Sequence, residues 1–292
     1  MDIVITYVDG NDPAWKRDYE KYTNVPVMQK RFRDWGTLKY LLRGIEVNMP
    51  FIRNVYLVVS HPSQVPQWAD QEHLKVVLHQ DIIPADHLPT FNSNPIEMHL
   101  HRIEGLDEEY LYFNDDLFPV MPCCKEDFFR EGKGVLGFST HWICSGMYKK
   151  ICRNSDRLAR EAAGMKSSCS FMRPQHICTP MLRSYCQELY DRYQQRILNS
   201  LTRTREAINV TQYTYLNYQY YKGLMIRERI SSKHCSAALM SPEKLASYIL
   251  CPERKILCIN DVRLSDSRYE ALRTVVHESF EKLFPSKSRF ER

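Results

Sequence analysis

The sequence predicts an α/β fold with a mainly parallel sheet and an additional helical half. Residues 2–8, DIVITYV, alternate in polarity and carry β-branched side chains, which is typical of a strand. Apolar residues at helical spacing within 37–45 predict a helix, and the apolar runs 54–59 and 74–78 predict two more strands. A strand, a helix and further strands in this order indicate βαβ units, in which the strands run parallel.

The rest of the chain follows the same two periodicities. We expect strands at 110–113 and 257–262, and helices at 149–166, 170–200, 209–222 and 267–284. No internal repeat or low-complexity linker separates these elements. We therefore expect a single domain, 1–292, with a soft subdivision into a βαβ half, 1–145, and a helix-rich half, 146–292.

The charge and cysteine content exclude several classes of protein. Lysine and arginine number 40 and aspartate and glutamate 35, so the net charge is +5. This small excess forms no dense basic stripe and accompanies no nucleic-acid motif, so we expect no nucleic-acid partner. The basic helix expected at 149–166 is interpreted as a solvated face rather than a membrane or acceptor surface. The ten cysteines show no zinc spacing, so we expect reduced, mostly buried thiols.

The strand at 110–113 ends in two adjacent carboxylates, Asp115 and Asp116. Open α/β sheets bind ligands beyond the carboxyl ends of their strands, and paired carboxylates there suit a divalent cation. Asparagine and aspartate are also common turn residues, so a solvated turn is the alternative. The many polar residues upstream, between Thr90 and Arg102, favour a functional site over a simple connection.

A second strand end repeats this pattern, because the strand expected at 257–262 reaches Asn260 and Asp261. Mg²⁺ is the expected ion, with Mn²⁺ as the alternative, since Mg²⁺ takes hard oxygen ligands while it bridges phosphates. For a general base, His176 in the run MRPQHICTP is the best single candidate. A lone histidine is more often structural, so the residues alone do not assign this role.

Several long runs resemble one family. HLPTFNSNPIEMHLHRIEGL followed by YLYFNDD resembles the second and longest conserved block of the Stealth family, DIVITYVDGNDPAW resembles the first block, and KILCIND with FPSKSRFE resembles the fourth. Stealth proteins include bacterial capsular-polysaccharide sugar-phosphate transferases and are related to the catalytic subunit of the lysosomal-enzyme N-acetylglucosamine-1-phosphotransferase. The resemblance spans nearly the whole chain.

The resemblance implies a Rossmann-like or GT-A-like sheet that binds a nucleotide sugar, and it implies a reaction. The chain would transfer a sugar-1-phosphate from a UDP-sugar to a glycan hydroxyl and release UMP. Two alternatives stay open: a metal-dependent glycosyltransferase that releases UDP, and a non-catalytic subunit that binds sugar nucleotides.

The resemblance also implies roles for individual residues. His176 would act on the acceptor hydroxyl or on a phosphate, and Arg205 and Arg227 would neutralise phosphate charge. Asp115, Asp116 and Asp261 would hold the metal. Substrate contacts are implied for Tyr7, Asp9 and Asp12 near the nucleotide, for Arg31, Asp34 and Arg43 near the donor, and for Asn92 and Asn209.

The partners follow from this reaction: a UDP-sugar donor, a glycan acceptor, and a peripheral contact with the membrane or with a capsule assembly complex. No run reaches the ~18 apolar residues that a membrane-spanning helix requires. Because Met1 leads directly into a strand rather than a leader sequence, we expect a cytoplasmic protein at the inner face of the membrane.

Overall fold

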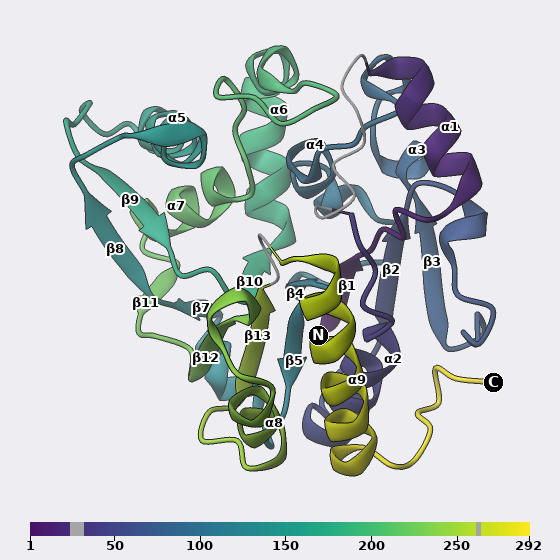
Figure 1. Ribbon diagram of the computed structural model, residues 1–292. Helices are drawn as coiled ribbons and strands as arrows, with labels where there is room; N and C mark the ends of the chain where they lie inside the picture. Colours follow the sequence, from purple (N-terminus) through teal and green to yellow (C-terminus); the bar gives the residue numbers. More distant parts are fainter. Residues whose placement is uncertain (24–31, 261–263) are drawn as a thin grey trace. The chain divides into compact units, whose positions relative to one another are not determined.

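The computed structural model describes residues 1–23, 32–260 and 264–292 (Figure 1). Its α-helices are α1 Pro13–Tyr22, α2 Leu38–Asn48, α3 His79–Ile82, α4 Ser93–Glu97, α5 Gly146–Ala162, α6 Arg183–Ser200, α7 Tyr213–Tyr221, α8 Pro242–Leu250 and α9 Asp266–Leu283. Its strands are β1 Asp2–Thr6, β2 Val55–Val59, β3 Leu74–Leu78, β4 Glu109–Asn114, β5 Leu117–Pro119, β6 Phe129–Arg130, β7 Lys133–Leu136, β8 Phe138–His141, β9 Phe171–Pro174, β10 Thr179–Leu182, β11 Met225–Arg227, β12 Ser232–Ser236 and β13 Ile256–Asn260.

The chain forms two compact units, each assembled from three separate segments. Unit 1 comprises residues 1–4, 77–112 and 125–230, and unit 2 comprises residues 5–76, 113–124 and 231–292. The division passes through β1, β3 and β4, so each of these strands contributes to both units. The expected single domain with a soft subdivision near residue 145 stays a prediction.

Unit 2 contains most of the predicted βαβ arrangement. Its strands are hydrogen-bonded in the order β4-β1-β2-β3. All five residues of β2 are buried, which is typical of a strand covered on both faces. Helix α2 buries the apolar face predicted from its sequence, including Leu38, Leu41, Leu42 and Ile45. Asn48, at the end of this helix, donates from Nδ2 to Pro119 O in β5 at 2.9 Å.

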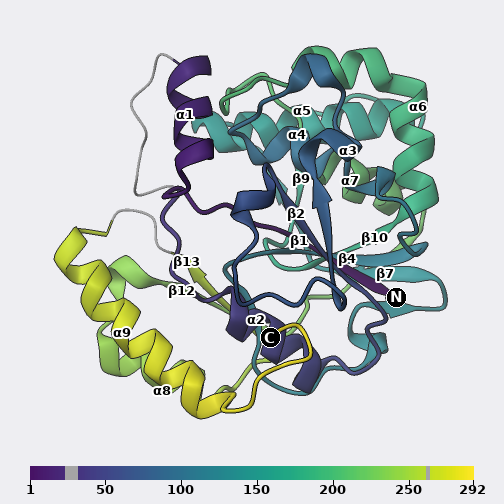
Figure 2. The same cartoon turned by 90° about the vertical axis from the view of Figure 1, so that its right-hand side faces the viewer.

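A second, three-stranded sheet in unit 2 has the order β12-β13-β5, with β12 parallel and β5 antiparallel to β13. Helices α8 and α9 pack against each other beside these strands (Figure 2). Tyr40 of α2 stacks on Phe280 of α9, with ring centroids 5.4 Å apart. The carboxyl ends of β1, β4 and β13, where the sequence predicts a site, therefore all belong to unit 2.

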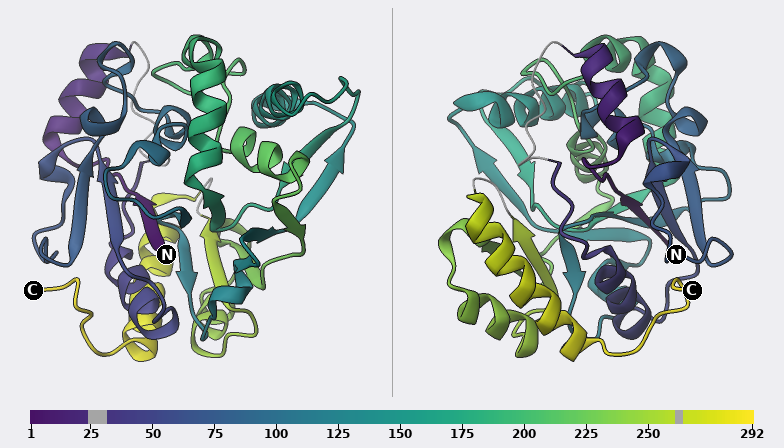
Figure 3. Two further views of the ribbon diagram at one scale, coloured as in Figure 1. Left: turned by 180° about the vertical axis from the view of Figure 1, so that it is seen from behind. Right: turned by 45° about the vertical axis from the view of Figure 1, so that its right-hand side comes forward.

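Unit 1 contains the first part of β1 and of β4. Strand β10 pairs with β4 in the antiparallel direction, and Thr179 lies opposite Tyr112 and Leu182 opposite Glu109. Two small sheets, β11-β7-β6 and β8-β9, accompany these strands. Helix α5 packs against α7 and β9, as the left view of Figure 3 shows. The aromatic-rich helix α7 is buried along nearly its whole length, which confirms that its tyrosines are core residues.

The α/β class with a mainly parallel sheet is confirmed. The helix expected across 170–200 is wrong in its first part, because 171–182 forms β9 and β10 and α6 begins at Arg183. Strands β6, β7, β11 and β12 and helix α8 were not predicted. Within the described residues, no disulfide joins two cysteines, and no helix combines the length and apolarity needed to cross a membrane.

Candidate functional site

The loop after β1 holds Asp9 in a defined position in unit 2. Asp9 N donates to Gln64 Oε1 at 2.6 Å, and Gln64 Nε2 donates to Asp9 O at 3.1 Å. Gln64 is only 2% exposed, so both bonds are protected from water. The next residue, Gly10, donates from N to Phe32 O at 2.8 Å, and a Cβ at Gly10 would clash with that oxygen. Glycine is therefore required where the loop passes Phe32.

Asp12 caps helix α1. Its Oδ1 accepts a hydrogen bond from Trp15 N at 2.7 Å, the usual role of an aspartate at this position. Burial opposes ionisation of Asp12, but the hydrogen bond from Trp15 N and those from Ser63 and Gln64 outweigh it and lower the pKa of the carboxyl. Asp12 therefore has a structural function in unit 2, and its contact with a nucleotide stays a prediction.

Tyr7, at the end of β1, meets Asp34. The Tyr7 hydroxyl donates to Asp34 Oδ2 at 3.0 Å, and Gly36 N donates to Asp34 Oδ1 at 2.9 Å. Burial is the main cause that raises the pKa of Tyr7, and the negative charges of Asp34, Asp9 and Asp115 raise it further. Tyr7 is therefore a neutral donor at neutral pH, surrounded by three carboxylates from three different loops.

Asp34 itself is partly desolvated. Burial raises the pKa of its carboxyl, as does the charge of Asp9, against the hydrogen bonds from Gly36 N and Tyr7 that lower it. Tyr269 of α9 donates from its hydroxyl to Asp34 O at 2.7 Å and so fixes the backbone of this loop. Three carboxylates predicted from the sequence, Asp9, Asp34 and Asp115, thus act electrostatically on Tyr7 in unit 2.

Asp115 and Asp116 form the turn that joins β4 to β5, so both sequence-based interpretations apply: the carboxylates follow a strand and lie in a turn. The adjoining strand β13 reaches the same turn. Ile259 N donates to Asp116 O at 2.9 Å, and the Cys258 thiol donates to Asp116 Oδ2 at 3.6 Å. Burial, followed by the charge of Asp116, raises the pKa of Cys258, so the thiol stays protonated. Asp261 lies outside the described residues.

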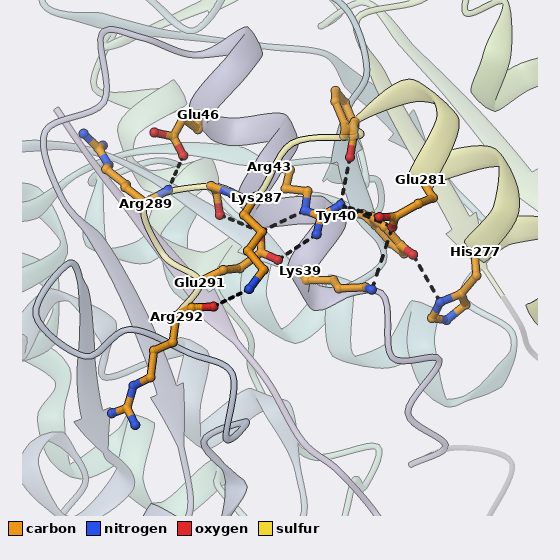
Figure 4. Close-up of polar contacts among 12 residues, drawn as sticks. Lys39, Tyr40, Arg43, Glu46, His277, Glu281, Lys287, Arg289, Glu291 and Arg292 are labelled. Carbon is orange, nitrogen blue, oxygen red and sulfur yellow. Dashed lines mark hydrogen bonds and ion pairs between the residues drawn. The ribbon is translucent and has the colours of Figure 1, made fainter.

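Arg43 of α2 lies in a buried ion-pair network (Figure 4). Its Nε and Nη2 each donate to Glu291 at 2.8 Å, and its Nη1 donates to Phe284 O at 2.8 Å and to Glu281 at 3.2 Å. The Arg43 and Glu291 side chains are each 5% exposed. These contacts make Arg43 a structural residue, and its role near the donor stays a prediction. Arg31 lies outside the described residues.

In unit 1, Asn92 and Asn209 join a buried network of amides. Asn92 Nδ2 donates to Asn209 Oδ1 at 2.9 Å and to Thr202 O at 3.0 Å. Asn209 Nδ2 donates to Ser200 O at 2.7 Å and to Thr202 Oγ1 at 2.8 Å. Both asparagines are at most 1% exposed. Their polar groups are used inside the protein, and their contact with substrate stays a prediction.

Arg205 lies next to this network. Its Nη2 donates to Ser93 Oγ at 2.7 Å, and its Nε is buried with no hydrogen-bond partner among the described residues. A buried guanidinium N–H without an acceptor is rare in proteins and suits an incoming anion. Arg205, one of the cations predicted for unit 1, therefore has a buried Nε–H that could donate a hydrogen bond to a phosphate.

His176 and Arg227 are both exposed side chains of unit 1. His176 lies in the bend between β9 and β10, where its imidazole is accessible to solvent. Arg227 closes β11 and donates from Nη2 to Phe138 O at 3.1 Å. Their accessibility is compatible with the roles in acceptor and phosphate binding, which stay predictions.

Two residues of this region were not predicted. Gln64 fixes the Asp9 loop through hydrogen bonds to a residue 55 positions away, which no local sequence pattern signals. Cys258 contacts Asp116, and its signal is the alternation of a strand, which places Cys258 and Asn260 on the same face of β13.

The carboxylates of unit 2 are ligands of the kind that a hard divalent cation takes. Carboxylate oxygens come from Asp9, Asp34, Asp115 and Asp116, and the charge of Asp9 already raises the pKa of Asp34. A cation near these groups would relieve that repulsion, and carboxylates are the ligands that Mg²⁺ and Mn²⁺ prefer.

Comparisons with known proteins agree with the resemblance. Residues 31–136 match the family description "Stealth protein CR2, conserved region 2". The receptor polysaccharide phosphotransferase WefC of Streptococcus oralis is 44% identical over 140 residues, 45% of this chain and 42% of that protein. The capsular polysaccharide phosphotransferase WcwK of Streptococcus pneumoniae is 27% identical over 332 residues, 100% of this chain and 99% of that protein.

A further relative, the exopolysaccharide phosphotransferase SCO6023 of Streptomyces coelicolor, is 32% identical over 313 residues, 100% of this chain and 52% of that protein. The matched chain thus spans about half or less of two of these three relatives. Among solved structures, the galactosyltransferase LgtC, in complex with donor and acceptor sugar analogs, matches with a TM-score of 0.42 and 11% identity, over 99% of this chain and 96% of that chain. A likeness this weak carries no argument. The match to this conserved region and the similarity to polysaccharide phosphotransferases together support the resemblance to the Stealth family.

Proposed function

We propose that this protein transfers a sugar-1-phosphate, of a hexose or an N-acetylhexosamine, from a UDP-sugar to a hydroxyl of a growing capsular polysaccharide or exopolysaccharide. The match to WcwK of Streptococcus pneumoniae carries this proposal, because that capsular polysaccharide phosphotransferase aligns over 100% of this chain and 99% of its own length. The products are a glycan phosphodiester and UMP. This reaction places the protein at the cytoplasmic face of the membrane, beside its glycan acceptor.

Unit 2 would bind the donor diphosphate. Asp115 and Asp116, with Asp261, would hold Mg²⁺ or Mn²⁺, and the grouping of Tyr7, Asp9, Asp34 and Asp115 supports this assignment. A bound divalent cation supplies charge neutralisation on the diphosphate. The Tyr7 hydroxyl keeps Asp34 oriented through its hydrogen bond, so the carboxylate does not turn away from the site.

Unit 1 would supply the cationic and acid–base groups. Arg205 has a buried Nε with no hydrogen-bond partner in the described chain, which supports a role in phosphate binding. Arg227 is exposed and would add a second guanidinium to the phosphoryl oxygens. His176 is exposed and would accept the proton of the acceptor hydroxyl on its imidazole.

The bond changes distinguish this reaction from its rivals. The acceptor oxygen forms a bond to the β-phosphorus of the UDP-sugar, and the bond between that phosphorus and the bridging oxygen breaks. The bridging oxygen leaves with UMP, and the acceptor proton passes to His176. A glycosyltransferase would instead break the anomeric C–O bond and release UDP. A binding subunit would release neither nucleotide.

Chromatography of the nucleotide products tests the proposal. The protein is incubated with a panel of UDP-sugars, Mg²⁺ and capsular oligosaccharides, with and without a chelator. UMP that appears with the metal and disappears with the chelator is the expected result. UDP as the product would overturn it in favour of glycosyl transfer, and donor binding without either product would identify a non-catalytic subunit.

Two aspartate variants make the assay specific. Asp116→Asn removes a charge from the proposed metal ligands and should lower UMP formation by about 100- to 1,000-fold, the size found when one group that stabilises charge in a transition state is removed. Asp266→Asn is the matched control, because Asp266 is an exposed aspartate of the same unit that pairs with Arg33. Equal activity of Asp116→Asn and the wild type would place the metal site elsewhere.

A further inference from the structure

The loop between β8 and α5 exposes large apolar side chains. Trp142 is 70% exposed and Ile143 is 73% exposed, and Met147 at the start of α5 is 48% exposed. We call residues 142–150, which leave β8 and enter α5, the β8–α5 tip. Tyr148, within the tip, is held by a hydrogen bond of 3.1 Å between its hydroxyl and that of Tyr213 in α7. The tip is therefore anchored to the helices of unit 1 while its apolar side chains face solvent.

These exposed residues are not part of a helix face that packs elsewhere in unit 1. Helix α5 buries its own apolar side chains, among them Ile151, Leu158 and Ala159, and it packs against α7 and β9. Trp142 and Ile143 precede this helix and add nothing to that core. Adjacent tryptophan and isoleucine at such exposure are rare on a protein surface without a partner.

The sequence around the tip is positively charged and contains no acidic residue. Between Gly132 and Ser155, and again between Ala162 and Gln187, there are seven lysines and arginines and no aspartate or glutamate. The net charge of the whole chain is only +5, so these two segments carry more positive charge than the chain as a whole. This separation of charge indicates a surface that attracts an extended negative partner.

Strand pairing brings the two segments together. His141 at the end of β8 pairs with Phe171 at the start of β9, so the loop that precedes β9 runs beside the tip (upper left in Figure 1). Burial lowers the pKa of His141, and the charges of Arg173 and Lys149 lower it further, which indicates that both cations lie near the root of the tip. Lys150 and Lys166 are exposed in the same two segments.

We propose that the β8–α5 tip docks on an anionic lipid bilayer, with Trp142 and Ile143 inserted at the interface and Lys149, Lys150 and Lys166 against the lipid phosphates. Tryptophan favours the boundary between headgroups and acyl chains, and lysines around an inserted apolar tip add attraction to anionic lipids. An acidic protein surface would also attract the lysines. The bilayer fits better because the apolar residues lie on a protruding loop rather than in a groove.

Sedimentation with vesicles tests this surface in the full chain. Vesicles of phosphatidylcholine with about 30% phosphatidylglycerol represent the anionic bilayer, and pure phosphatidylcholine vesicles are the control. Wild type should bind the anionic vesicles and lose most of this binding in high salt. The double variant Trp142→Ser/Ile143→Ser should bind at least about tenfold more weakly. Lys149→Gln/Lys150→Gln should weaken binding by about fivefold for each lysine removed.

Ile208→Ser is the matched control, because Ile208 is an apolar residue of unit 1 that is 57% exposed and lies outside both basic segments. Vesicle binding by Ile208→Ser should equal that of the wild type. The proposal is overturned if wild type does not bind anionic vesicles, or if Trp142→Ser/Ile143→Ser binds them as tightly as Ile208→Ser. Loss of affinity for an acidic protein in these variants, with vesicle binding unchanged, would assign the tip to a protein partner instead.

This inference does not depend on the proposed reaction. Release of UMP with a water-soluble oligosaccharide acceptor, measured without vesicles, should be the same for Trp142→Ser/Ile143→Ser and the wild type. Absence of UMP in both proteins would contradict the proposed function and leave the vesicle result intact.

Discussion

The two units bury polar groups of different kinds. Unit 2 concentrates charge: Asp9, Asp34 and Asp115 act on Tyr7, and Arg43 is buried with Glu291. Most polar groups that unit 1 buries are neutral, such as the amides of Asn92 and Asn209 and the imidazoles of His99 and His101. Its buried carboxylates include Asp156, which is paired with Arg160. The sequence presents both sets as polar residues next to strands and helices, yet their physical functions differ.

The difference lies in whether the polar atoms are already used inside the protein. The amide of Asn209 donates and accepts within unit 1, so it stabilises the fold. Near Tyr7, the charge of Asp9 raises the pKa of Asp34, so this pair of carboxylates would be stabilised by a bound cation. A polar motif in the sequence can therefore mark either a binding site or residues that support the fold, and the hydrogen-bond contacts distinguish the two.

The largest predicted effect is the loss of the buried ion pair in unit 2. Arg43→Ala leaves Glu291 buried without its cation, and we expect the free energy of unfolding to fall by about 4 kcal/mol. Arg130→Ala is the matched control in unit 1, because Arg130 and Glu228 form a similar bidentate pair in which both side chains are exposed. Urea denaturation of the control should be nearly unchanged. Equal losses in both variants would mean that burial does not distinguish the two pairs.

The second prediction concerns the amide network of unit 1. Asn209→Ala removes one acceptor of Asn92 Nδ2, the side-chain acceptor of Glu206 N and a donor to Ser200 O, so we expect a loss of about 3 kcal/mol in unfolding free energy. Asn199→Ala removes an exposed amide of α6 that accepts a hydrogen bond from Gln195 Nε2 at 2.9 Å, and it should change stability little. If Asn209→Ala is stable and instead raises the KM for the donor, Asn209 binds substrate as the resemblance implied.

The third prediction uses the neutral histidines. Burial lowers the pKa of His99 to about 4 and that of His101 to about 3. The unfolded chain takes up these protons below about pH 6.5, whereas the folded chain does not, so stability is complete above this pH and falls as pH decreases towards about 4. Each histidine contributes a slope of up to about 1.4 kcal/mol per pH unit.

His101→Phe removes one of the two buried histidines and so tests its contribution to the dependence of stability on pH. Both nitrogens of His101 lack a hydrogen-bond partner in the described chain, and its ring packs against Tyr190 and Tyr215, so phenylalanine preserves the packing. Between pH 4 and 6.5, unfolding of this variant should take up one proton fewer, so the slope of the unfolding free energy against pH should be smaller. An unchanged slope in urea denaturation would show that His101 does not titrate in this way.

The smallest predicted effect concerns Tyr7. Tyr7→Phe removes a hydrogen bond that lowers the pKa of Asp34, so that pKa, already raised by burial, rises further. If activity requires ionised Asp34, the acid limb of the pH–rate profile should move to higher pH by up to about one unit. Tyr248→Phe in α8 of the same unit should leave the profile in place. A profile unchanged by Tyr7→Phe would remove Asp34 from the groups that control activity.

The sequence predicted the long, periodic elements well. Strand β3 begins and ends where the apolar run 74–78 does, and α9 lies within one residue of the range expected for it. Strands β6 and β7 escaped prediction because they are two and four residues long, and glycines surround them. Such short strands depend on pairing with β11, which periodicity cannot show.

The candidate site likewise contains residues that the sequence predicted and contacts that it did not. Carboxylates at strand ends were predictable, since the end of an apolar run places Asp115 and Asp116 by local pattern alone. The partners of Arg43 were not, because Glu281 and Glu291 lie 238 and 248 positions away in the chain. Apolar patterning likewise could not show that Trp142 and Ile143 stay exposed, since both residue types are usually buried.

The distance along the chain between Arg43 and Glu291 also affects how the protein is made. At translation rates of about 5–20 residues per second, Arg43 is synthesised roughly 12–50 s before Glu291. During this interval Arg43 has no carboxylate to pair with, and the apolar face of α2 awaits Phe280 of α9. The buried ion pair and the packing of α2 against α9 can therefore form only after α9 has been synthesised.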